Sequence, residues 1–328
     1  KTDAICSGGT FTVTPATGSG NTVPSNTTYT WGAPVSSPVG AITGGSAQAT
    51  GVSSISQTLT NTTTNQATLT YTVTPKSGGC TGAAFTVTVT VDPTSLGGSV
   101  GNAQNVCNGS QPANNLTLSN SVGSVIKWQK STTEGFEVGT VTDITNTTTT
   151  LTATVIGNLS ADTWFRAVVK SGECAAVNST PVKITVYGIP TTAIVGSTQK
   201  ICGTLTSNSL GGNSPTVGTG AWSKKSGPEG ATVTFSDATS GNSTAMVSAV
   251  GTYVFTWTIS NAPCTASTAD VTVNYYTAQV APTLSPTAPT CSNSNGTVTV
   301  TAPLDEGEND IYQYSSDGGS SWQETTSF

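Results

Sequence analysis

The stretch Phe85-Thr86-Val87-Thr88-Val89-Thr90-Val91 carries an apolar residue at every second position, with threonine in between. Side chains of a β-strand point alternately to its two faces, so this pattern predicts a strand with one buried face. Two later stretches, PVKITVY at 181–187 and ADVTVNY at 269–275, repeat the pattern. Each closes a unit of roughly 90–100 residues, and recurrence at a fixed period predicts a tandem array of domains.

The composition of the chain excludes several functional classes. There is no histidine among 328 residues, so neither a Ser-His-Asp triad nor a histidine metal site is available. Ten Lys and Arg against sixteen Asp and Glu give a net charge of -6, which excludes the basic surface that binds nucleic acid. Valine, threonine and aromatic residues dominate the apolar runs, which predicts an all-β fold.

The cysteines follow the same repeat. Each of the first three units contains one early and one late cysteine, and no CxxC motif occurs, which argues against a metal or redox site. Pairing the cysteines by their order predicts one disulfide within each unit, and hence an oxidising, extracytoplasmic environment. The expected pairs are Cys6–Cys80, Cys107–Cys174 and Cys202–Cys264, and the partner of Cys291 is expected beyond Phe328.

The resulting boundaries are 1–92, 93–188, 189–280 and 281–328. In each of the first three units a tryptophan lies between the two cysteines, an order typical of immunoglobulin-like β-sandwiches. The linkers between units are short and contain proline, which limits bending. We therefore expect an extended rod on the order of 120–140 Å, with strands of about seven residues at ~3.3 Å each in every domain. Since the chain ends inside a strand-like run, we also expect it to be a segment of a longer protein.

The first and third units resemble the PKD-like and immunoglobulin-like repeats of very large Bacteroidetes surface proteins. The matching residues are Tyr29-Thr30-Trp31 and the strand closing at Val91 in the first unit, and 218–222 and 251–253 in the third. The last segment is similar to the SprB repeat of gliding-motility adhesins, through Cys291, Gly-Thr-Val at 296–298 and the run 314–322. The resemblance implies secretion, often by the type IX route, and an adhesive or stalk function. It also implies a PKD-like domain at 1–92, immunoglobulin-like domains at 93–188 and 189–280 (the latter also PKD-like), and a truncated SprB-type repeat at 281–328.

Two features of the last segment are candidate ligand sites. Asp305, Glu306, Glu308 and Asp310 could supply several of the six to eight oxygens that calcium requires, but they lack EF-hand spacing, and a solvated acidic loop is the favoured interpretation. The pattern from Ser315 to Trp322 resembles the Asp-box of sialidases, a structural turn without catalytic residues.

These observations predict a non-enzymatic segment of a secreted cell-surface adhesin, without a cofactor or a catalytic residue. Surface glycans, other surface or motility proteins and the rest of the same chain are the expected partners; nucleic acid and membrane insertion are not expected. One alternative is an array of carbohydrate-binding modules, for which Trp164 and Trp322 are the candidate platforms. Another is the accessory region of a secreted glycan hydrolase.

Overall fold

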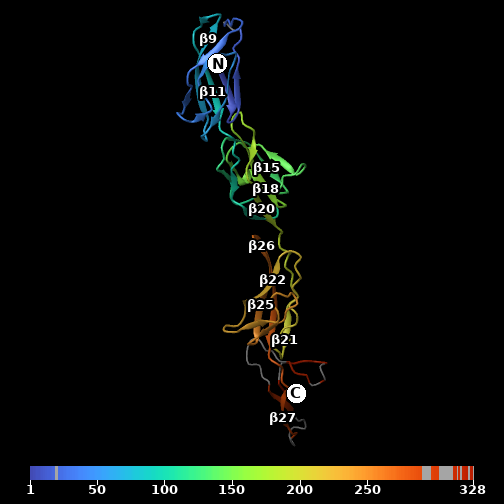
Figure 1. Ribbon diagram of the computed structural model, residues 1–328. Helices are drawn as coiled ribbons and strands as arrows, with labels where there is room; N and C mark the ends of the chain where they lie inside the picture. Colours follow the sequence, from blue (N-terminus) through green and yellow to red (C-terminus); the bar gives the residue numbers. More distant parts are fainter. Residues whose placement is uncertain are drawn as a thin grey trace. The chain divides into compact units, whose positions relative to one another are not determined.

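The computed structural model describes residues 1–18, 21–289, 297–302, 313–315, 317, 320–323 and 326–327. The regular secondary structure of these residues is almost entirely β-strand, and it includes one four-residue helix, α1 (Ala153–Ile156). The expected all-β fold with tandem sandwich domains is confirmed. Figure 1 shows the strands gathered in successive layered domains along the chain.

The first domain packs two β-layers against each other. Its larger sheet has the order β1-β11-β9-β3-β6, in which β1 runs parallel to β11 and the other neighbours are antiparallel. The facing layer contains the pairs β2–β7 and β5–β8. The strands are β1 (Thr2–Cys6), β2 (Thr10–Val13), β3 (Thr28–Trp31), β4 (Val35–Ser37), β5 (Ile42–Thr43), β6 (Gln48–Val52), β7 (Ile55–Thr58), β8 (Thr60–Asn61), β9 (Ala67–Ser77), β10 (Cys80–Thr81) and β11 (Phe85–Asp92).

The second domain repeats this plan. Its larger sheet has the order β13-β20-β18-β15-β16, in which β13 runs parallel to β20, and its smaller sheet has the order β12-β14-β17. The strands are β12 (Ser99–Gly101), β13 (Gln104–Cys107), β14 (Leu116–Ser119), β15 (Ser124–Ser131), β16 (Val141–Ile144), β17 (Thr150–Leu151), β18 (Thr163–Lys170), β19 (Val177–Asn178) and β20 (Val182–Tyr187).

The third domain has a four-stranded sheet, β21-β26-β25-β22, and the separate pair β23–β24. Its first strand is also parallel to its last. The strands are β21 (Gln199–Cys202), β22 (Thr219–Ser226), β23 (Val233–Phe235), β24 (Ala245–Val247), β25 (Gly251–Asn261) and β26 (Cys264–Tyr276). In the last segment, β27 (Thr283–Thr287) pairs with β28 (Thr297–Ala302).

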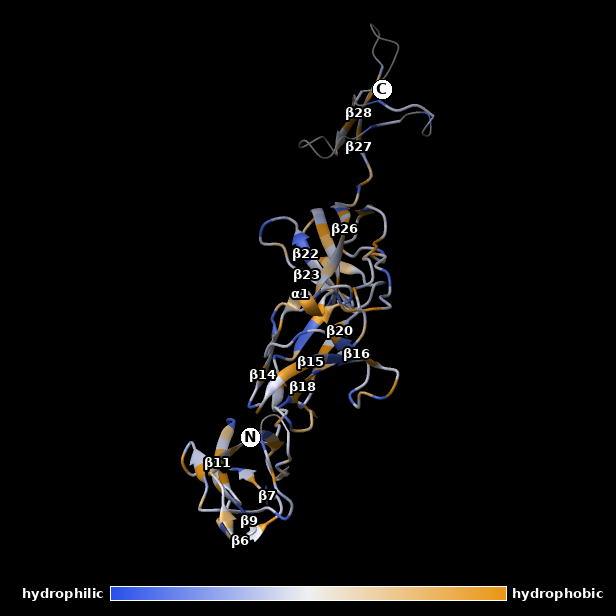
Figure 2. Cartoon of the chain, turned by 90° about the horizontal axis from the view of Figure 1, so that it is seen from above, coloured by the Kyte–Doolittle hydropathy of each residue, from blue (hydrophilic) through white to orange (hydrophobic). Residues whose placement is uncertain are grey.

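Each of the first three domains has its own hydrophobic core, built from the inward positions of the alternating strands. Apolar residues are concentrated on strands such as β11 and β20 (Figure 2). A tryptophan anchors each core, and its indole N–H donates to a backbone carbonyl 2.9–3.0 Å away: Trp31 to Ser46, Trp128 to Thr148 and Trp222 to Ser240. Tryptophan buries a large apolar area, but its N–H still needs a hydrogen-bond partner, and in each of the three domains a backbone carbonyl is that partner.

The chain divides into two compact units. One contains Lys1–Ile189 together with Asn261–Thr265, and the other contains Pro190–Ser260 and Ala266–Phe328. The short turn that joins β25 to β26 therefore groups with the first unit. The observed disulfides explain this grouping, because one of them joins Cys264 in that turn to Cys107 in the second domain.

The expected disulfide pairing within each domain is wrong. Within the described part of the chain, the structure joins Cys6 to Cys174 and Cys107 to Cys264, and leaves Cys80 and Cys202 as exposed thiols. Cys6 lies beside the last residue of β11, whereas Cys80 precedes the first residue of that strand. The eight residues of β11 span roughly 25 Å at ~3.3 Å per residue, far beyond the ~7 Å between Cα atoms that a disulfide can bridge. The two cysteines of one domain therefore lie at its opposite ends.

Candidate functional site: the disulfide-linked junctions

The early cysteine of each domain occupies one fixed position in the sheet. In the parallel registers, Cys6 lies opposite Asp92, Cys107 opposite Tyr187 and Cys202 opposite Tyr276. The backbone N–H that follows each cysteine donates to the carbonyl of that opposite residue, at 2.8, 2.7 and 3.1 Å respectively. We call this end of a domain, where its last strand finishes, the exit pole.

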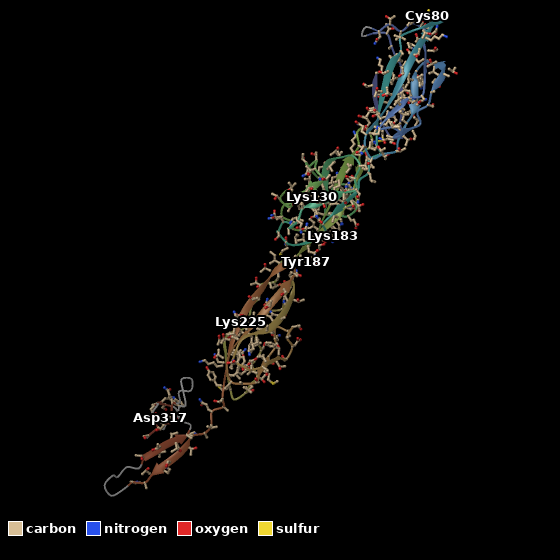
Figure 3. All side chains as sticks on the ribbon, turned by 90° about the vertical axis from the view of Figure 1, so that its left-hand side faces the viewer. Cys80, Lys130, Lys183, Tyr187, Lys225 and Asp317 are labelled. Atoms are coloured by element: carbon tan, nitrogen blue, oxygen red, sulfur yellow. A yellow bond between two sulfur atoms is a disulfide. The ribbon has the colours of Figure 1, made fainter. Side chains whose placement is uncertain are left out.

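The late cysteine of each domain lies at the other end. Cys80, Cys174 and Cys264 each lie at the end of a tight turn, which follows β9, β18 and β25 respectively. The turns are Ser77-Gly78-Gly79-Cys80, Ser171-Gly172-Glu173-Cys174 and Asn261-Ala262-Pro263-Cys264. We call this end the hairpin pole. Figure 3 shows Cys80 at the tip of the first domain.

The first junction joins the exit pole of the first domain to the hairpin pole of the second. The Cα atoms of Cys6 and Cys174 are 4.6 Å apart, within the normal range for a disulfide. Cys174 is buried, and its Sγ lies 3.2 Å from the carbonyl oxygen of Pro93 in the linker. The backbone N–H of Ser171 donates to Ser95 Oγ at 2.9 Å, so the hairpin is also tied to the linker by a buried hydrogen bond.

A buried carboxylate organises the same junction. Asp92 is 4 % exposed, and its two oxygens accept hydrogen bonds from different domains. Gln66 Nε2 of the first domain donates to Oδ1 at 2.7 Å, and the backbone N–H of Glu173 in the second domain donates to Oδ2 at 2.8 Å. A buried carboxylate is tolerated only when its oxygens are hydrogen-bonded. Asp92 thus fixes the hairpin of the second domain against the end of the first.

Gly172 makes this contact sterically feasible. Its φ is +44°, in the left-handed region that favours glycine, and a Cβ atom at this position would overlap the Asp92 carboxylate. Only a residue without a side chain lets the hairpin backbone approach Asp92 so closely.

The second disulfide forms an equivalent junction. Cys107 and Cys264 have Cα atoms 5.0 Å apart, and the Sγ of Cys264 lies 3.4 Å from the carbonyl oxygen of Gly188. Asn261 Nδ2 donates to the same Gly188 carbonyl at 2.7 Å. Here a side-chain amide from the hairpin takes the place that the Asp92 contact has in the first junction.

An ion pair supports the exit pole of the second domain. Asp162 Oδ2 lies 2.6 Å from Lys183 Nζ, and the backbone N–H of Val186 donates to Asp162 Oδ1 at 2.8 Å. These bonds, the one from Lys183 first, lower the pKa of the Asp162 carboxyl below its ordinary value. Val186 directly precedes Tyr187, so the charge of Asp162 helps to hold the strand end that leads into the second junction.

Most of the remaining predicted site residues lie outside the described part of the chain. Cys291 and the calcium candidates Asp305, Glu306, Glu308 and Asp310 lie outside the described residues. Of the two aromatic candidates, Trp164 is half-buried with Lys183 Nζ 4.8 Å from its ring centroid, and Trp322 is 60 % exposed.

The turn around Asp317 has the structural role expected of it. Its carboxylate accepts hydrogen bonds from Ser315 Oγ at 2.7 Å and from the backbone N–H of Ser321 at 2.9 Å. The bonds from Ser321, followed by that from Ser315, lower the pKa of Asp317. The exposure of Trp322 differs from the Asp-box arrangement, in which the tryptophan packs beneath the turn.

Within the described residues, no group of three or more Cys, Asp or Glu side chains is placed to hold a metal ion. The same part of the chain contains no helix long and apolar enough to cross a bilayer.

Sequence reasoning missed Asp92, Ser95 and Gly172, which hold the first junction together. A lone carboxylate before a proline is typical of a turn, so the sequence alone marks Asp92 as an ordinary linker residue. The useful signal lies in strand direction. Since β1 and β11 are parallel, Cys6 is carried to the end of β11, away from Cys80.

Comparisons with known proteins match one family profile to each of the first two domains. The profile of a PKD-like domain matches residues 3–95, and that of a domain of unknown function (DUF8696) matches residues 96–188. Each matches less than a third of the chain. No curated protein matches it.

Solved structures with similarity to the chain include three of related architecture. The PKD domain from KIAA 1837 protein is 25% identical, with 28% of this chain and 91% of that chain covered and a TM-score of 0.24. An I-band fragment of titin is 14% identical, with 84% and 95% covered and a TM-score of 0.40. A Ca²⁺-stabilised adhesin with which an Antarctic bacterium binds ice is 14% identical, with 91% and 80% covered and a TM-score of 0.33.

Proposed function

We propose that this chain is a structural and adhesive extracellular segment in which disulfides between successive β-sandwich domains resist mechanical extension. The observation that carries the proposal is the placement of both disulfides across domain junctions. Disulfides persist in oxidising compartments outside the cytoplasm, which supports an extracellular location. The PKD-like first domain agrees with a non-catalytic role.

The mechanical consequence follows from the connectivity. The Cys6–Cys174 bond removes 168 residues from the shortest covalent path along the chain. Even after the domains unfold, those residues cannot lengthen the protein. At roughly 3.6 Å per extended residue, the withheld length is about 600 Å. Disulfides within single domains would limit the extension of each domain separately, whereas each of these disulfides also holds the end of one domain against the hairpin of the next.

Single-molecule stretching of the chain from its two ends tests this role. We expect the fully extended length to increase by about 700 Å when both disulfides are reduced, because the two overlapping loops together withhold more chain than either loop alone. A Cys80→Ala/Cys202→Ala variant is the matched control and should extend like the unmodified protein before reduction. Equal lengths for oxidised and reduced chains would contradict the proposal.

The finer assignment is a stalk or adhesive segment of a gliding-motility adhesin, exported by type IX secretion to a bacterial surface. Its support is the resemblance of the run ending at Trp322 to SprB-type repeats. The expected rod shape and the boundaries at 92, 188 and 280 belong to the same proposal. Small-angle scattering giving a maximum dimension below about 100 Å would contradict the rod, since a compact 328-residue globule has a radius of gyration of only ~20 Å.

Glycan binding is the second candidate, favoured by the 60 % exposure of Trp322 beside the Asp317 turn. Exposed aromatic faces suit sugar rings, and the other tryptophans are buried or, like Trp164, half-covered. A glycan array probed with the chain and with its Trp322→Ala variant tests this function. Binding that the substitution abolishes would support it, and an array without binding would contradict it.

A further inference from the structure

The hairpin pole of the first domain contains a large cavity. Its volume is about 1030 Å³, and its lining includes Lys1, Val23, Tyr29, Cys80 and Phe85. Tyr29 and Phe85 meet edge to face with ring centroids 6.1 Å apart, so the cavity has an aromatic wall. Residues 15–16 and 21–24, which follow the strand β2, border the cavity. One edge of β2 pairs with β7, and its other edge has no strand partner among the described residues.

In the second domain, the place that corresponds to this cavity is a groove, and a segment of the chain itself fills it. The segment 96–101 runs directly before β13 and forms β12, which pairs with β14 so that Val100 lies opposite Leu118. The other edge of the segment 96–101 is hydrogen-bonded to Thr180, which lies shortly before β20. Thr180 N–H donates to the Gly98 carbonyl at 2.9 Å, and Val100 N–H donates to the Thr180 carbonyl at 3.2 Å. The Val100 side chain is buried in the core.

The third domain fills its groove in the same way. Residues 191–196 run directly before the strand β21 and bond to the segment 210–217, with Gly196 N–H donating to the Leu210 carbonyl at 2.9 Å. Ala193 is buried, and its N–H donates to Ser267 Oγ at 2.9 Å. Both filling segments end in Val-Gly, six residues before the early cysteine of their domain.

The cysteines at the hairpin poles show the same contrast. Cys174 and Cys264 are buried and bonded to the early cysteine of the domain before them. Cys80 occupies the equivalent place after its turn, but it is exposed and unbonded. The unfilled groove and the unbonded thiol are independent observations, and both lie at the pole where the other two domains receive a predecessor.

We propose that the hairpin pole of the first domain is an open junction whose occupant is the polypeptide directly preceding Lys1 in a longer chain. That polypeptide enters the cavity as an extended strand with a small or aliphatic side chain buried in the groove, and pairs with the free edge of β2. A domain of the same type ahead of it supplies an early cysteine, which bonds to Cys80. This inference does not depend on the adhesive function.

The covalent step is a thiol–disulfide exchange with a small-molecule disulfide such as oxidised glutathione. The Cys80 thiolate attacks one sulfur of that disulfide, forms a mixed disulfide and releases one thiolate. The second cysteine then attacks the Cys80 sulfur and releases the other. Two protein thiols are oxidised, one small disulfide is reduced to two thiols, and two protons pass to water or to the released thiolates.

A chain with a duplicated first domain tests the proposal. Residues 1–101 are placed directly before Lys1, which keeps the natural linker and places a second Val100-Gly101 at the groove. In a glutathione buffer, we expect the added Cys6 to bond to the original Cys80. The original Cys80 should then lose its alkylation, and the amides of the original β2 should exchange hydrogen more slowly. Cys202 should remain reactive, and it is the internal reference for alkylation.

Two controls separate the parts of the inference. Replacing the added Cys6 by serine should restore Cys80 alkylation and leave the slowed exchange at β2. Replacing the added Val100 by aspartate should weaken the protection of β2. The proposal is overturned if the original Cys80 and β2 react as in the unextended chain. It is also overturned if the unextended chain forms Cys80–Cys202 bonds between copies, because a second copy would then be the occupant.

Discussion

Cys6 lies opposite Asp92 in the parallel pairing of β1 with β11, so one residue pair joins the start of a domain to its end. The cysteine bonds to the hairpin of the next domain, and the carboxylate accepts the N–H of Glu173 from that same hairpin at 2.8 Å. The disulfide and the hydrogen bond therefore start from the adjacent strands β1 and β11, and both end on the four-residue turn 171–174. Such an arrangement restrains both the distance between the two domains and the orientation of the turn.

Peptide mapping of the oxidised chain should recover Cys6 linked to Cys174 and Cys107 linked to Cys264. Native alkylation should label Cys80 and Cys202, because both thiols are exposed. Mass spectrometry of a digest made without reduction is the measurement. A peptide that joins Cys6 to Cys80 would contradict the staggered pairing and would require the first domain to fold differently.

Substituting Gly172 by alanine should destabilise the first junction by about 1–3 kcal/mol. A residue with a side chain is strained at a φ of +44°, and the new Cβ would also displace the Asp92 carboxylate. We expect faster hydrogen exchange at Glu173 N–H and a lower unfolding temperature.

Gly78 is the matched control for this substitution. It occupies the equivalent place in the turn before Cys80, with a φ of +55°, but a Cβ atom added to it would meet no other atom within 4 Å. Gly78→Ala should therefore cost only the backbone strain, about 1 kcal/mol. Equal effects of the two substitutions would show that the contact with Asp92 contributes nothing.

The alternating runs and turn residues were sufficient to predict the strands and the sandwich class. The strand predicted from Phe85 to Val91 is β11, extended by Asp92, and the alternating run at 269–275 lies in β26. These patterns depend on the alternation of side chains between two faces, which is local in sequence. The cores around Trp31, Trp128 and Trp222 follow from the same alternation.

The junctions could not be predicted from the same patterns. Cysteine order is compatible with pairing inside domains or between them, and the choice depends on which end of the sheet each cysteine reaches. That in turn depends on β1 lying parallel to β11, a contact between residues more than 80 positions apart. The buried position of Asp92 likewise arises only when the second domain supplies Glu173.

The exit pole of the second domain should weaken in acid through Asp162. Bonds from Lys183 and from Val186 N–H place the pKa of this carboxyl below the ordinary value of about 3.9. The unfolded chain therefore binds the proton at a higher pH than the folded one. The stabilisation is complete above about pH 4–5 and is lost as the pH falls through the folded pKa.

Hydrogen exchange of residues 182–187 between pH 6 and pH 3, corrected for intrinsic rates, measures this loss. Asp162→Asn should reduce protection at pH 6 and flatten its pH dependence. Asp3→Asn, at a carboxylate without a lysine partner among the described ion pairs, is the control and should leave this strand unchanged. A pH profile that is identical in Asp162→Asn and in the unmodified chain would contradict the assignment.

Two tryptophans of the third domain should respond differently to the same substitution. Trp222 and Trp257 are both buried, with ring centroids 5.1 Å apart, but their indole N–H groups differ. Trp222 donates to the Ser240 carbonyl at 3.0 Å, whereas Trp257 Nε1 has no hydrogen-bond partner among the residues that the structure describes. Replacing Trp222 by phenylalanine removes this hydrogen bond in addition to the loss of packing, while the Ser240 carbonyl keeps its bond from Ser243 N–H at 3.1 Å.

We therefore expect Trp222→Phe to lower the free energy of unfolding by about 1 kcal/mol more than Trp257→Phe. In Trp257→Phe the loss of packing is partly offset by removal of an unsatisfied buried donor. Calorimetric unfolding of both variants, with the disulfides intact, gives the comparison. A larger loss for Trp257→Phe would mean that tight packing around its ring, where a Cβ on Gly220 would overlap it, outweighs the hydrogen bond of Trp222.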